Sequence, residues 1–397
     1  MPLVSRLTLQ NAAATVSLPP YLLARRFLRR APSSATRWVI SGHSGRMYAD
    51  NAGALHALLS SEGHDVTWIS ADAGLTRMLQ AKNARVLTRN SFEARRAIEQ
   101  ASVLAYSHGP TDLDHLLLKS CALPGLRVHL NHCMSHLKVW TQHAVTTLPR
   151  DFRRAPVRDA FDYMLASSPR EQSNLQRSFT GAGSRIVIGG GAHLDAFMRA
   201  RSEQPARSLA YFPTFRDTAE GKRQLEDVIR ALSANTRLRE WLVKEDFHLH
   251  ILGHVNSGSG HVHDARSERI HFPPASAIGD VILQSSTLIS DYSGVICDYL
   301  ALDRPMVFFP FDQQSYLRAR GLYVDYDQFV FGPRVSDVDA LVELIVSGQY
   351  RDEAPFAERR AAWRREFFPT LQPTYARRTL DTIERLLAED AARASQA

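Results

Sequence analysis

Apolar runs and amphipathic segments alternate along the first half of the chain. Segments with helical periodicity separate most of the runs that predict β-strands, at 38–40, 84–87, 103–106, 128–130, 163–166 and 185–188. After the first strand comes a Gly/Ser-rich loop, and Asp50 could cap a helix that runs to about Ser61, ahead of another strand. Strands that alternate with helices favour parallel pairing with right-handed crossovers, so this half predicts an α/β domain.

The same pattern begins again after the polar, proline-containing segment 199–208, which predicts an interdomain linker. Helices are expected over about 223–242 and from 293, between strands at 209–212, 247–252, 287–289 and 306–309. The tail from Val338 is helical in pattern, with interruptions near Gly348 and Pro355. The chain thus divides into a basic N-terminal segment, two α/β domains and C-terminal helices, at 1–36, 37–200, 207–345 and 346–397. Two such sheets place a ligand cleft at the carboxyl ends of their strands.

Composition narrows the class of protein. A hydrophobic content of 44% and a charged content of 22% are typical of a folded protein. The 3 cysteines, Cys121, Cys133 and Cys297, are too few and too widely spaced for a disulfide framework, which favours a reducing compartment. There is no apolar run of the roughly 18 residues that a membrane span needs and no signal-peptide layout at the N-terminus. These features predict a cytoplasmic protein.

The net charge of +7 suggests an anionic partner: nucleic acid, a membrane surface or a phosphorylated substrate. Zinc-finger spacing, an RNP-like aromatic strand and a basic arm with interleaved aromatics are all missing, so nucleic acid is not expected. In segment 21–30, Leu22, Leu23, Phe27 and Leu28 fall near one helical face among arginines. Such a helix would lie on an anionic membrane surface, which would make the protein peripheral on the inner face of the cytoplasmic membrane. The alternatives are a helix that packs on its own domain and a disordered leader.

The segment "STLISDYSGVICDYLALDRPMVFF", 286–309, carries the strongest binding signal. A buried strand reaches Asp291, a turn follows, and a helix begins. The unpaired N–H groups of a helix N-terminus bind phosphate, Ser293 can donate its hydroxyl, and Gly294 lets the backbone come close. Asp298, one turn later, could accept a ribose hydroxyl. The alternative is that Asp291 and Ser293 only cap the helix.

The segment "LAYFPTFRD", 209–217, has a similar layout, with Pro213, Thr214 and Arg216 at the end of a strand. A guanidinium is a planar, permanently charged fork that can hold a phosphoryl group through two hydrogen bonds. The alternative for Arg216 is a surface ion pair with Asp217.

Several motifs together resemble the CDP-glycerol glycerophosphotransferase family, the polymerases and primases of teichoic-acid-like polymers. The resemblance covers about residues 37–337 and is most specific in "YFPTFRD", "ISDYSGVICDYLALDRPMVFFPFD" and "GLYVDYDQFVFGP". "GRMYADNAGALHALL", which contains Asp50 and Asn51, looks like the glycine–aromatic–Asp-Asn motif of that family. "IGGGAHLDAF" is similar to its Gly-x-Pro-Arg-x-Asp motif, but Gly190, Ala192, His193 and Asp195 stand there and the arginine is missing.

The resemblance implies two Rossmann-like domains that face a central cleft, the GT-B architecture. It also implies that an acceptor hydroxyl attacks the phosphorus bearing a polyol and that CMP leaves. The donor would be CDP-glycerol or a relative such as CDP-ribitol, and the acceptor a glycan or a lipid-linked glycan. Asp50, Asn51 and Thr214 would bind substrate, and no cofactor or metal is implied.

The segment "RVHLNHCMSHLKVW", 127–140, is similar to a His-Gly pair of the family that a lysine follows. By this resemblance His132 is the candidate general base, Cys133 replaces the glycine, and Lys138 holds phosphate charge or positions the loop. An imidazole suits general-base catalysis because its pKa lies near neutral pH. Two alternatives are a zinc site at His132 and His136, and Cys133 as a nucleophile.

The segment "FHLHILGHVN" places His254 where the family has a Lys-x-His-Pro segment, with Leu252 and Val255 in place of the lysine and the proline. His254 could stabilise the pyrophosphate or protonate the departing CMP. With the missing arginine, these departures indicate an outlying member, with a different polyol or acceptor.

Two other functions fit the same residues: a GT-B glycosyltransferase that uses a nucleotide sugar, and a non-catalytic basic protein that binds an anionic polymer or membrane.

Overall fold

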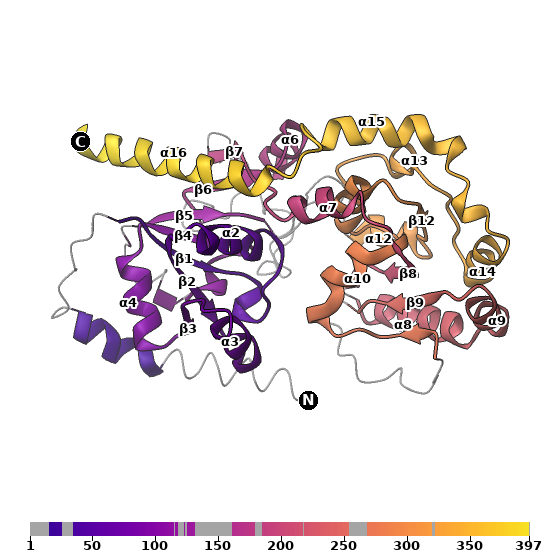
Figure 1. Ribbon diagram of the computed structural model, residues 1–397, viewed down its shortest axis with the longest axis horizontal. Helices are drawn as coiled ribbons and strands as arrows, with labels where there is room; N and C mark the ends of the chain where they lie inside the picture. The colour runs from indigo at the N-terminus through magenta and orange to yellow at the C-terminus, as the bar shows by residue number, and fades with distance from the viewer. Residues whose placement is uncertain are drawn as a thin grey trace.

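Two parallel β-sheets organise the chain, one in each half (Figure 1). The computed structural model describes residues 16–25, 35–114, 116–117, 123, 125–131, 161–178, 185–216, 218–253, 268–319 and 322–396. Helices cover both sheets, and the last helix crosses from the second half back over the first (Figure 1). The predicted α/β fold class is therefore confirmed.

The first sheet has seven strands in the order β3-β2-β1-β4-β5-β6-β7, and all neighbouring strands pair in parallel. The strands are β1 Arg37–Ser41, β2 Asp65–Ser70, β3 Val86–Thr88, β4 Val103–Tyr106, β5 Leu126–His129, β6 Tyr163–Ala166 and β7 Ile186–Ile188. The helices of this half are α2 Asp50–Ser61, α3 Ala73–Gln80, α4 Phe92–Gln100, α6 Pro169–Ser178 and α7 Leu194–Ala200. All residues of the central strand β4 are buried, as expected for a parallel sheet covered on both faces.

Side-chain caps start two of these helices where the sequence offers Asp or Ser. Asp72 accepts a hydrogen bond from the Leu75 amide at the start of α3, and Ser91 caps α4. Asp50 begins α2 with φ of 52°, after Ala49 at the N-cap position. As expected of a capping carboxylate, its Oδ1 atom accepts from an amide of the first turn, that of Ala52, at 3.2 Å. The same oxygen accepts from the Ser107 hydroxyl at 2.8 Å, which directs the carboxylate toward β4.

The second sheet has five parallel strands in the order β10-β9-β8-β11-β12. They are β8 Ala206–Phe212, β9 His248–Ile251, β10 Ile270–His271, β11 Ser285–Ser290 and β12 Met306–Phe308. The helices are α8 Ala219–Ala234, α9 Thr236–Lys244, α10 Ile278–Gln284, α11 Val295–Tyr299, α12 Gln313–Ala319, α13 Tyr326–Phe329 and α14 Val338–Val346. The single helix expected over 223–242 is thus two helices. Asn235 follows the last residue of α8, and its side chain caps α9 by accepting from the Leu238 amide at 3.0 Å.

The C-terminal helices are α15 Ala357–Phe367 and α16 Tyr375–Gln396. In Figure 1, α16 lies along the first half, over β5, β6 and α2. Leu380, Ile383 and Leu386 belong to the same buried cluster as Trp38 of β1. The Asp195 carboxylate accepts hydrogen bonds from the first two amides of α16, at 2.7 and 3.0 Å, and so fixes where this helix begins.

The described part of the basic N-terminal segment, residues 16–25, packs on its own domain, one of the three expected alternatives. Residues 16–25 form a helix, and Tyr21 on it is 1% exposed. The Tyr21 hydroxyl donates to Glu99 of α4 at 2.6 Å, and Arg25 pairs with the same carboxylate. Phe27 and Leu28 lie outside the described residues. No helix among the residues that the structure describes is long and apolar enough to cross a membrane.

Candidate active site

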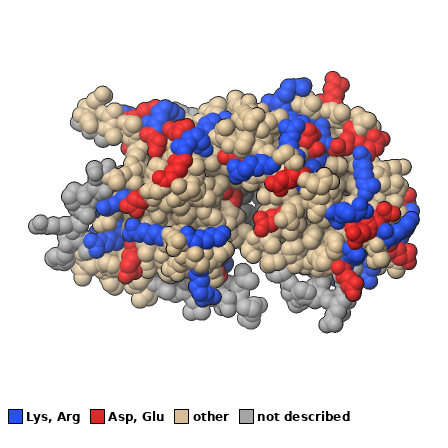
Figure 2. Space-filling view, viewed as in Figure 1, with Lys and Arg blue, Asp and Glu red and all other residues tan. Residues whose placement is uncertain are grey.

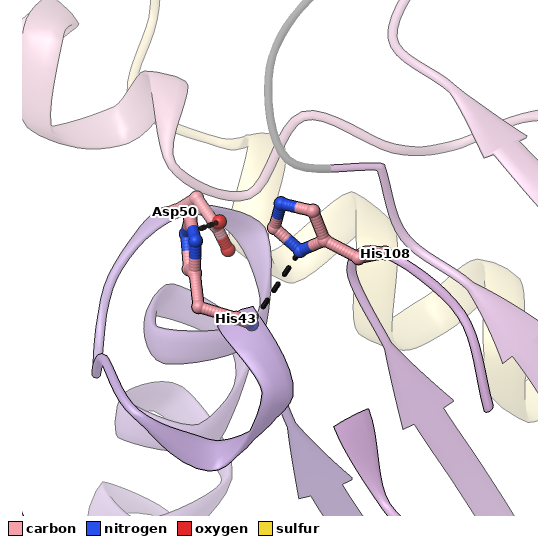
Figure 3. Close-up of side chains that lie close together, drawn as sticks. All are labelled: His43, Asp50 and His108. Atoms are coloured by element: carbon pink, nitrogen blue, oxygen red, sulfur yellow. Dashed lines mark hydrogen bonds and ion pairs between the residues drawn. The ribbon is translucent and has the colours of Figure 1, made fainter. Parts of the chain in front are cut away.

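Two histidines and a carboxylate meet at the carboxyl ends of β1 and β4 (Figure 3). The His43 Nε2 atom lies 2.6 Å from the Asp50 Oδ2 atom. The His43 backbone amide donates to His108 Nδ1 at 3.4 Å, and the two imidazole rings are 4.3 Å apart between centroids. His43, Ser44 and Asp50 all have φ near +50°, a strained conformation for residues other than glycine that is often found at functional sites.

A buried carboxylate, Asp112, holds the two loops of this cluster together. Its Oδ1 atom accepts from the Ser44 amide at 2.6 Å, and its Oδ2 atom accepts from the amides of Ser107 and His108 at 3.1 and 2.8 Å. Burial raises the pKa of Asp112 to about 6, although the hydrogen bonds from these amides act in the opposite direction. Asp112 therefore fixes the positions of His43 and His108 relative to each other.

The Asp50 carboxylate sets the charge of the His43 imidazole. Burial alone would lower the pKa of His43, but the ion pair with Asp50 and the charge of Asp112 raise it above its ordinary value. An imidazole whose one nitrogen is held by a carboxylate can accept a proton at the other nitrogen. The ligand atoms of His43, Asp50 and His108 also lie within 4.8 Å of one another, a spacing that a divalent cation could use.

In the second half, Asp291 at the end of β11 collects the residues expected to bind phosphate. Its Oδ1 atom accepts from the Thr214 amide at 2.9 Å and the Thr214 hydroxyl at 2.6 Å. Its Oδ2 atom accepts from Arg216 Nη2 at 2.8 Å. Asp312 accepts two further bonds from Arg216, at 2.6 and 2.8 Å. The side chains of Thr214, Arg216, Asp291 and Asp312 are all buried, and Arg216 links Asp291 at the end of β11 to Asp312 in the segment after β12.

Arg216 therefore has protein partners where a free phosphate fork was expected. Its side chain is 4% exposed, and a further hydrogen bond goes to the Thr214 carbonyl. The guanidinium carbon lies 5.4, 4.9 and 5.2 Å from the ring centroids of Tyr292, Phe311 and Tyr316. This arrangement indicates a residue that shapes the turn after β11.

The turn at Ser293 and Gly294 leads into α11 without a side-chain cap. Gly294 has ordinary helical angles, φ −58° and ψ −25°. The Ser293 hydroxyl makes only a long contact of 3.4 Å with the Val295 amide. Asp291 accepts from the Tyr292 amide at 2.6 Å and does not cap the helix, so the capping alternative is wrong for Asp291.

Asn51 of the first half and Asp298 of the second were both expected to bind substrate. His193, which was not expected to bind substrate, contacts both of them. His193, just before α7, lies with Nδ1 2.7 Å from Asn51 Oδ1 and Nε2 3.1 Å from Asp298 Oδ1. All three side chains are nearly or fully buried. Asn51 and His193 also line a small pocket, together with Leu130, Asn131, Leu165, Ser167, Glu171 and Gly191.

Three expected site residues, His132, Lys138 and His254, lie outside the described residues, so their roles stay predictions. The rivals at Cys133 and His136 lie there too. The last residue described before His132 is Asn131, at the carboxyl end of β5, where its side chain donates to the Leu165 carbonyl at 2.9 Å.

Sequence reasoning missed His43, His108 and Asp112. Each follows β1 or β4 within a few residues, so the rule that parallel sheets bind ligands at their carboxyl ends could have identified them. Their loops contain no familiar motif beyond the Asp-Asn pair that begins α2. His193 could have been found because it lies in the segment similar to the Gly-x-Pro-Arg-x-Asp motif, from which the arginine is missing.

Two parallel α/β domains with candidate residues at the strand ends between them define the GT-B class of fold. The chain belongs to the family described as CDP-Glycerol:Poly(glycerophosphate) glycerophosphotransferase, whose sequence profile matches residues 23–385. It is 28% identical over 214 residues to a teichoic acid ribitol-phosphate primase of Bacillus spizizenii, across 50% of this chain and 53% of that protein. It is 22% identical over 353 residues to a teichoic acid glycerol-phosphate transferase of Staphylococcus aureus, across 81% of this chain and 85% of that protein.

Solved structures share the fold at low sequence identity. The wall teichoic acid polymerase TagF superposes with a TM-score of 0.67 at 18% identity, across 95% of this chain and 98% of that chain. A TagF variant soaked with CDPG gives a TM-score of 0.70 at 16% identity, with the same coverage. A putative UDP-N-acetylglucosamine 2-epimerase from Listeria monocytogenes gives 0.54 at 14% identity, across 89% of this chain and 98% of that chain. The chain spans about half the length of the first curated relative.

Proposed function

We propose that this protein transfers a polyol phosphate, glycerol phosphate in the first place, from a CDP-activated donor to a hydroxyl of a glycan or lipid-linked acceptor and releases CMP. Family membership supports the reaction class. The observation that carries the proposal is the His43–Asp50 pair at the strand ends of the first half. The residue after Asp50, Asn51, is linked through His193 to Asp298 of α11 in the second half. Cell-surface polymer synthesis is the process in which such a transfer is used by the relatives named above.

The first chemical role falls to His43. Asp50 holds the proton on His43 Nε2, which leaves Nδ1 to accept the proton of the acceptor hydroxyl. The acceptor oxygen then forms its bond to the phosphorus that bears the polyol, and the bond from that phosphorus to the CMP oxygen breaks. A positioned base of this kind contributes about 10²–10⁴ in rate. His132 remains the second candidate for the same role, by resemblance to the family motif.

The second half holds the donor. The turn at Ser293 and Gly294 precedes α11, where helix amides favour an anionic diphosphate. Arg216 and Thr214 hold this turn in place by donating hydrogen bonds to the Asp291 carboxylate, which precedes it. Such chemistry depends on alignment and fixed charge around the transferred group, and the buried network supplies the alignment.

The test is CMP release from CDP-glycerol and from CDP-ribitol by the full chain with a polyol-phosphate-primed acceptor, followed by chromatography. We expect His43→Asn to reduce turnover by about 10²–10⁴. The matched control is His64→Asn, a partly exposed histidine that faces Glu62 at 3.6 Å, and it should retain wild-type turnover. If His43→Asn retains activity, His43 is not the general base, and His132→Asn is the next variant to test. Product formation from a nucleotide sugar in place of both CDP donors would instead establish a glycosyltransferase.

The same proposal includes peripheral association with the inner membrane surface. It is supported by the helix at 16–25, on which Val16 and Leu23 are 74% and 65% exposed although Tyr21 is buried. Sedimentation with vesicles of anionic phospholipid should be stronger than with neutral vesicles, and Leu23→Asp should weaken it. Equal sedimentation of the variant and the wild type would assign any membrane contact to another surface.

A further inference from the structure

The imidazole of His193 faces an oxygen acceptor at each of its two nitrogens. Nδ1 is 2.7 Å from Asn51 Oδ1, and Nε2 is 3.1 Å from Asp298 Oδ1. Asn51 belongs to α2 of the first half and Asp298 to α11 of the second. His193 itself lies just before α7, the helix that runs toward the second sheet (Figure 1). One side chain thus connects the two halves beside the candidate site.

The orientation of the Asn51 amide is fixed independently of His193. Its Nδ2 atom donates to the Leu130 and Asn131 carbonyls, at 3.0 and 3.1 Å. Its Oδ1 atom must therefore face His193, whose backbone amide also donates to it at 3.1 Å. A neutral imidazole carries one N–H. Only the doubly protonated ring can donate to Asn51 and at the same time present a positive charge to Asp298, with which Nε2 forms an ion pair. In the neutral ring, one nitrogen would face a buried oxygen with no proton between them.

We propose that protonated His193 is a positioning residue that holds α2 of the first half and α11 of the second in register, and that losing its proton loosens this contact. The structural part of this proposal is independent of the proposed function, and only its effect on turnover rests on that function. Asn51 adjoins Asp50, the partner of the candidate base, and Asp298 lies one turn after the donor turn. The contact therefore sets the distance between the proposed base and the proposed diphosphate site.

The charges around His193 favour its protonated form. Burial alone would lower the pKa of His193, but the Asp298 carboxylate, with smaller contributions from Asp50 and Glu171, raises it above 6.5. Glu171 of α6 accepts from the amide and hydroxyl of Ser167, each at 2.7 Å. The edge of the Phe197 ring of α7, 6.0 Å away, adds no charge. Among the described residues, these carboxylates are the charged groups that shift the pKa of this imidazole.

The sign of the pH effect follows from this direction. A group whose pKa is raised on folding stabilises the folded protein fully below its unfolded value of 6.5 and loses that stabilisation as the pH rises through the folded value. The stabilising contact between the halves should thus be present at pH 6 and weakened at pH 9.

The first experiment measures melting temperature against pH for the full chain and for His193→Gln, His193→Arg and Asp298→Asn, without substrate. The wild type should exceed His193→Gln and Asp298→Asn by several degrees at pH 6, and the difference should shrink toward pH 9. His193→Arg stays charged, so its difference from the wild type should not follow this titration. His64→Gln is the control for a histidine outside the contact. A difference that is the same at both pH values for His193→Gln and for Asp298→Asn would overturn the proposal.

The second experiment measures CMP release from CDP-glycerol over the same pH range. The wild type should lose about tenfold in kcat/KM between the protonated and neutral forms of His193, the value of one charge-assisted hydrogen bond. Asp298→Asn should lack this alkaline decrease. An alkaline decrease that persists in Asp298→Asn would assign it to another group and refute the kinetic part. If no variant releases CMP from CDP-glycerol, the proposed function fails, and the melting experiment still decides the contact.

Discussion

Replacement of Arg216 by lysine tests whether this residue shapes the second domain or holds substrate. Lysine keeps the positive charge but loses the planar fork that reaches two carboxylates at once. In the structure, Arg216 donates to both oxygens of Asp312, at 2.6 and 2.8 Å, to Asp291 at 2.8 Å and to the Thr214 carbonyl. With a side chain 4% exposed, it has no water to replace a lost partner.

The expected loss of stability follows from these contacts. A lysine ammonium at this position can keep one carboxylate and leaves the other buried without its cation. Breaking a buried ion pair in this way costs about 3–5 kcal/mol, and the lost stacking on Tyr292, Phe311 and Tyr316 adds to it. A domain of this size shifts by about 2–4 °C per kcal/mol, so the second domain of Arg216→Lys should melt about 10 °C lower.

The measurement is thermal melting by circular dichroism and calorimetry, with donor affinity from titration calorimetry below the melting range. Arg230→Lys is the matched control, because Arg230 and its partner Asp227 are 67% and 68% exposed on α8, and it should stay within about 0.5 kcal/mol of the wild type. The reasoning would be refuted by an Arg216→Lys protein that melts like the wild type yet no longer binds CDP-glycerol. That result would return Arg216 to its expected role as a phosphate ligand.

Three further predictions concern the first half. In Asp50→Asn, the pKa of His43 should fall, because burial lowers it and only the weaker effect of the Asp112 charge still raises it; the acid limb of the activity profile should shift to lower pH while maximal turnover decreases. Treatment with EDTA followed by gel filtration should leave CMP release unchanged, whereas a loss that Zn²⁺ or Mn²⁺ restores would assign a cation to His43, Asp50 and His108. Tyr21→Ala should destabilise the first domain by about 3 kcal/mol in urea unfolding, because its buried ring packs 5.1 Å from Phe92, and an unchanged midpoint would contradict this packing.

The elements that could be predicted from the sequence are those encoded by local pattern. The strands β4 and β6 occupy the residues expected. Buried parallel strands appear in the sequence as short apolar runs, and the amphipathic helical segments on either side mark where each run begins and ends. The strand β10 was not expected, since Ile270–His271 is too short to give a period. The division of α8 from α9 was missed because Asn235 interrupts an otherwise continuous amphipathic pattern.

The candidate site could be predicted only in part because its contacts join residues far apart in the sequence. The segment ending at Asp291 was recognised as a binding element, but its partner Asp312 was not, and this partner changes the role of Arg216. Asp50 likewise combines a positive φ with a hydrogen bond from Ser107 of the loop after β4, a partner that no property of the helix sequence reveals. Local motifs identified which strand ends matter, and tertiary contacts decided which side chains remain available there.

The arrangement of the two halves gives His193 its significance. An imidazole of the first half was expected to face a diphosphate site in the second, and His193 does contact α11 directly through Asp298. Its side chain is only 10% exposed, however, and both its nitrogens are directed at protein oxygens, so it is not suited to accept a proton from an acceptor hydroxyl. His43 retains 19% side-chain exposure and one nitrogen free of Asp50, which is what a base requires. In the proposed mechanism the two imidazoles therefore have different roles: His43 transfers the proton, and His193 holds the two halves at the distance that the transfer needs.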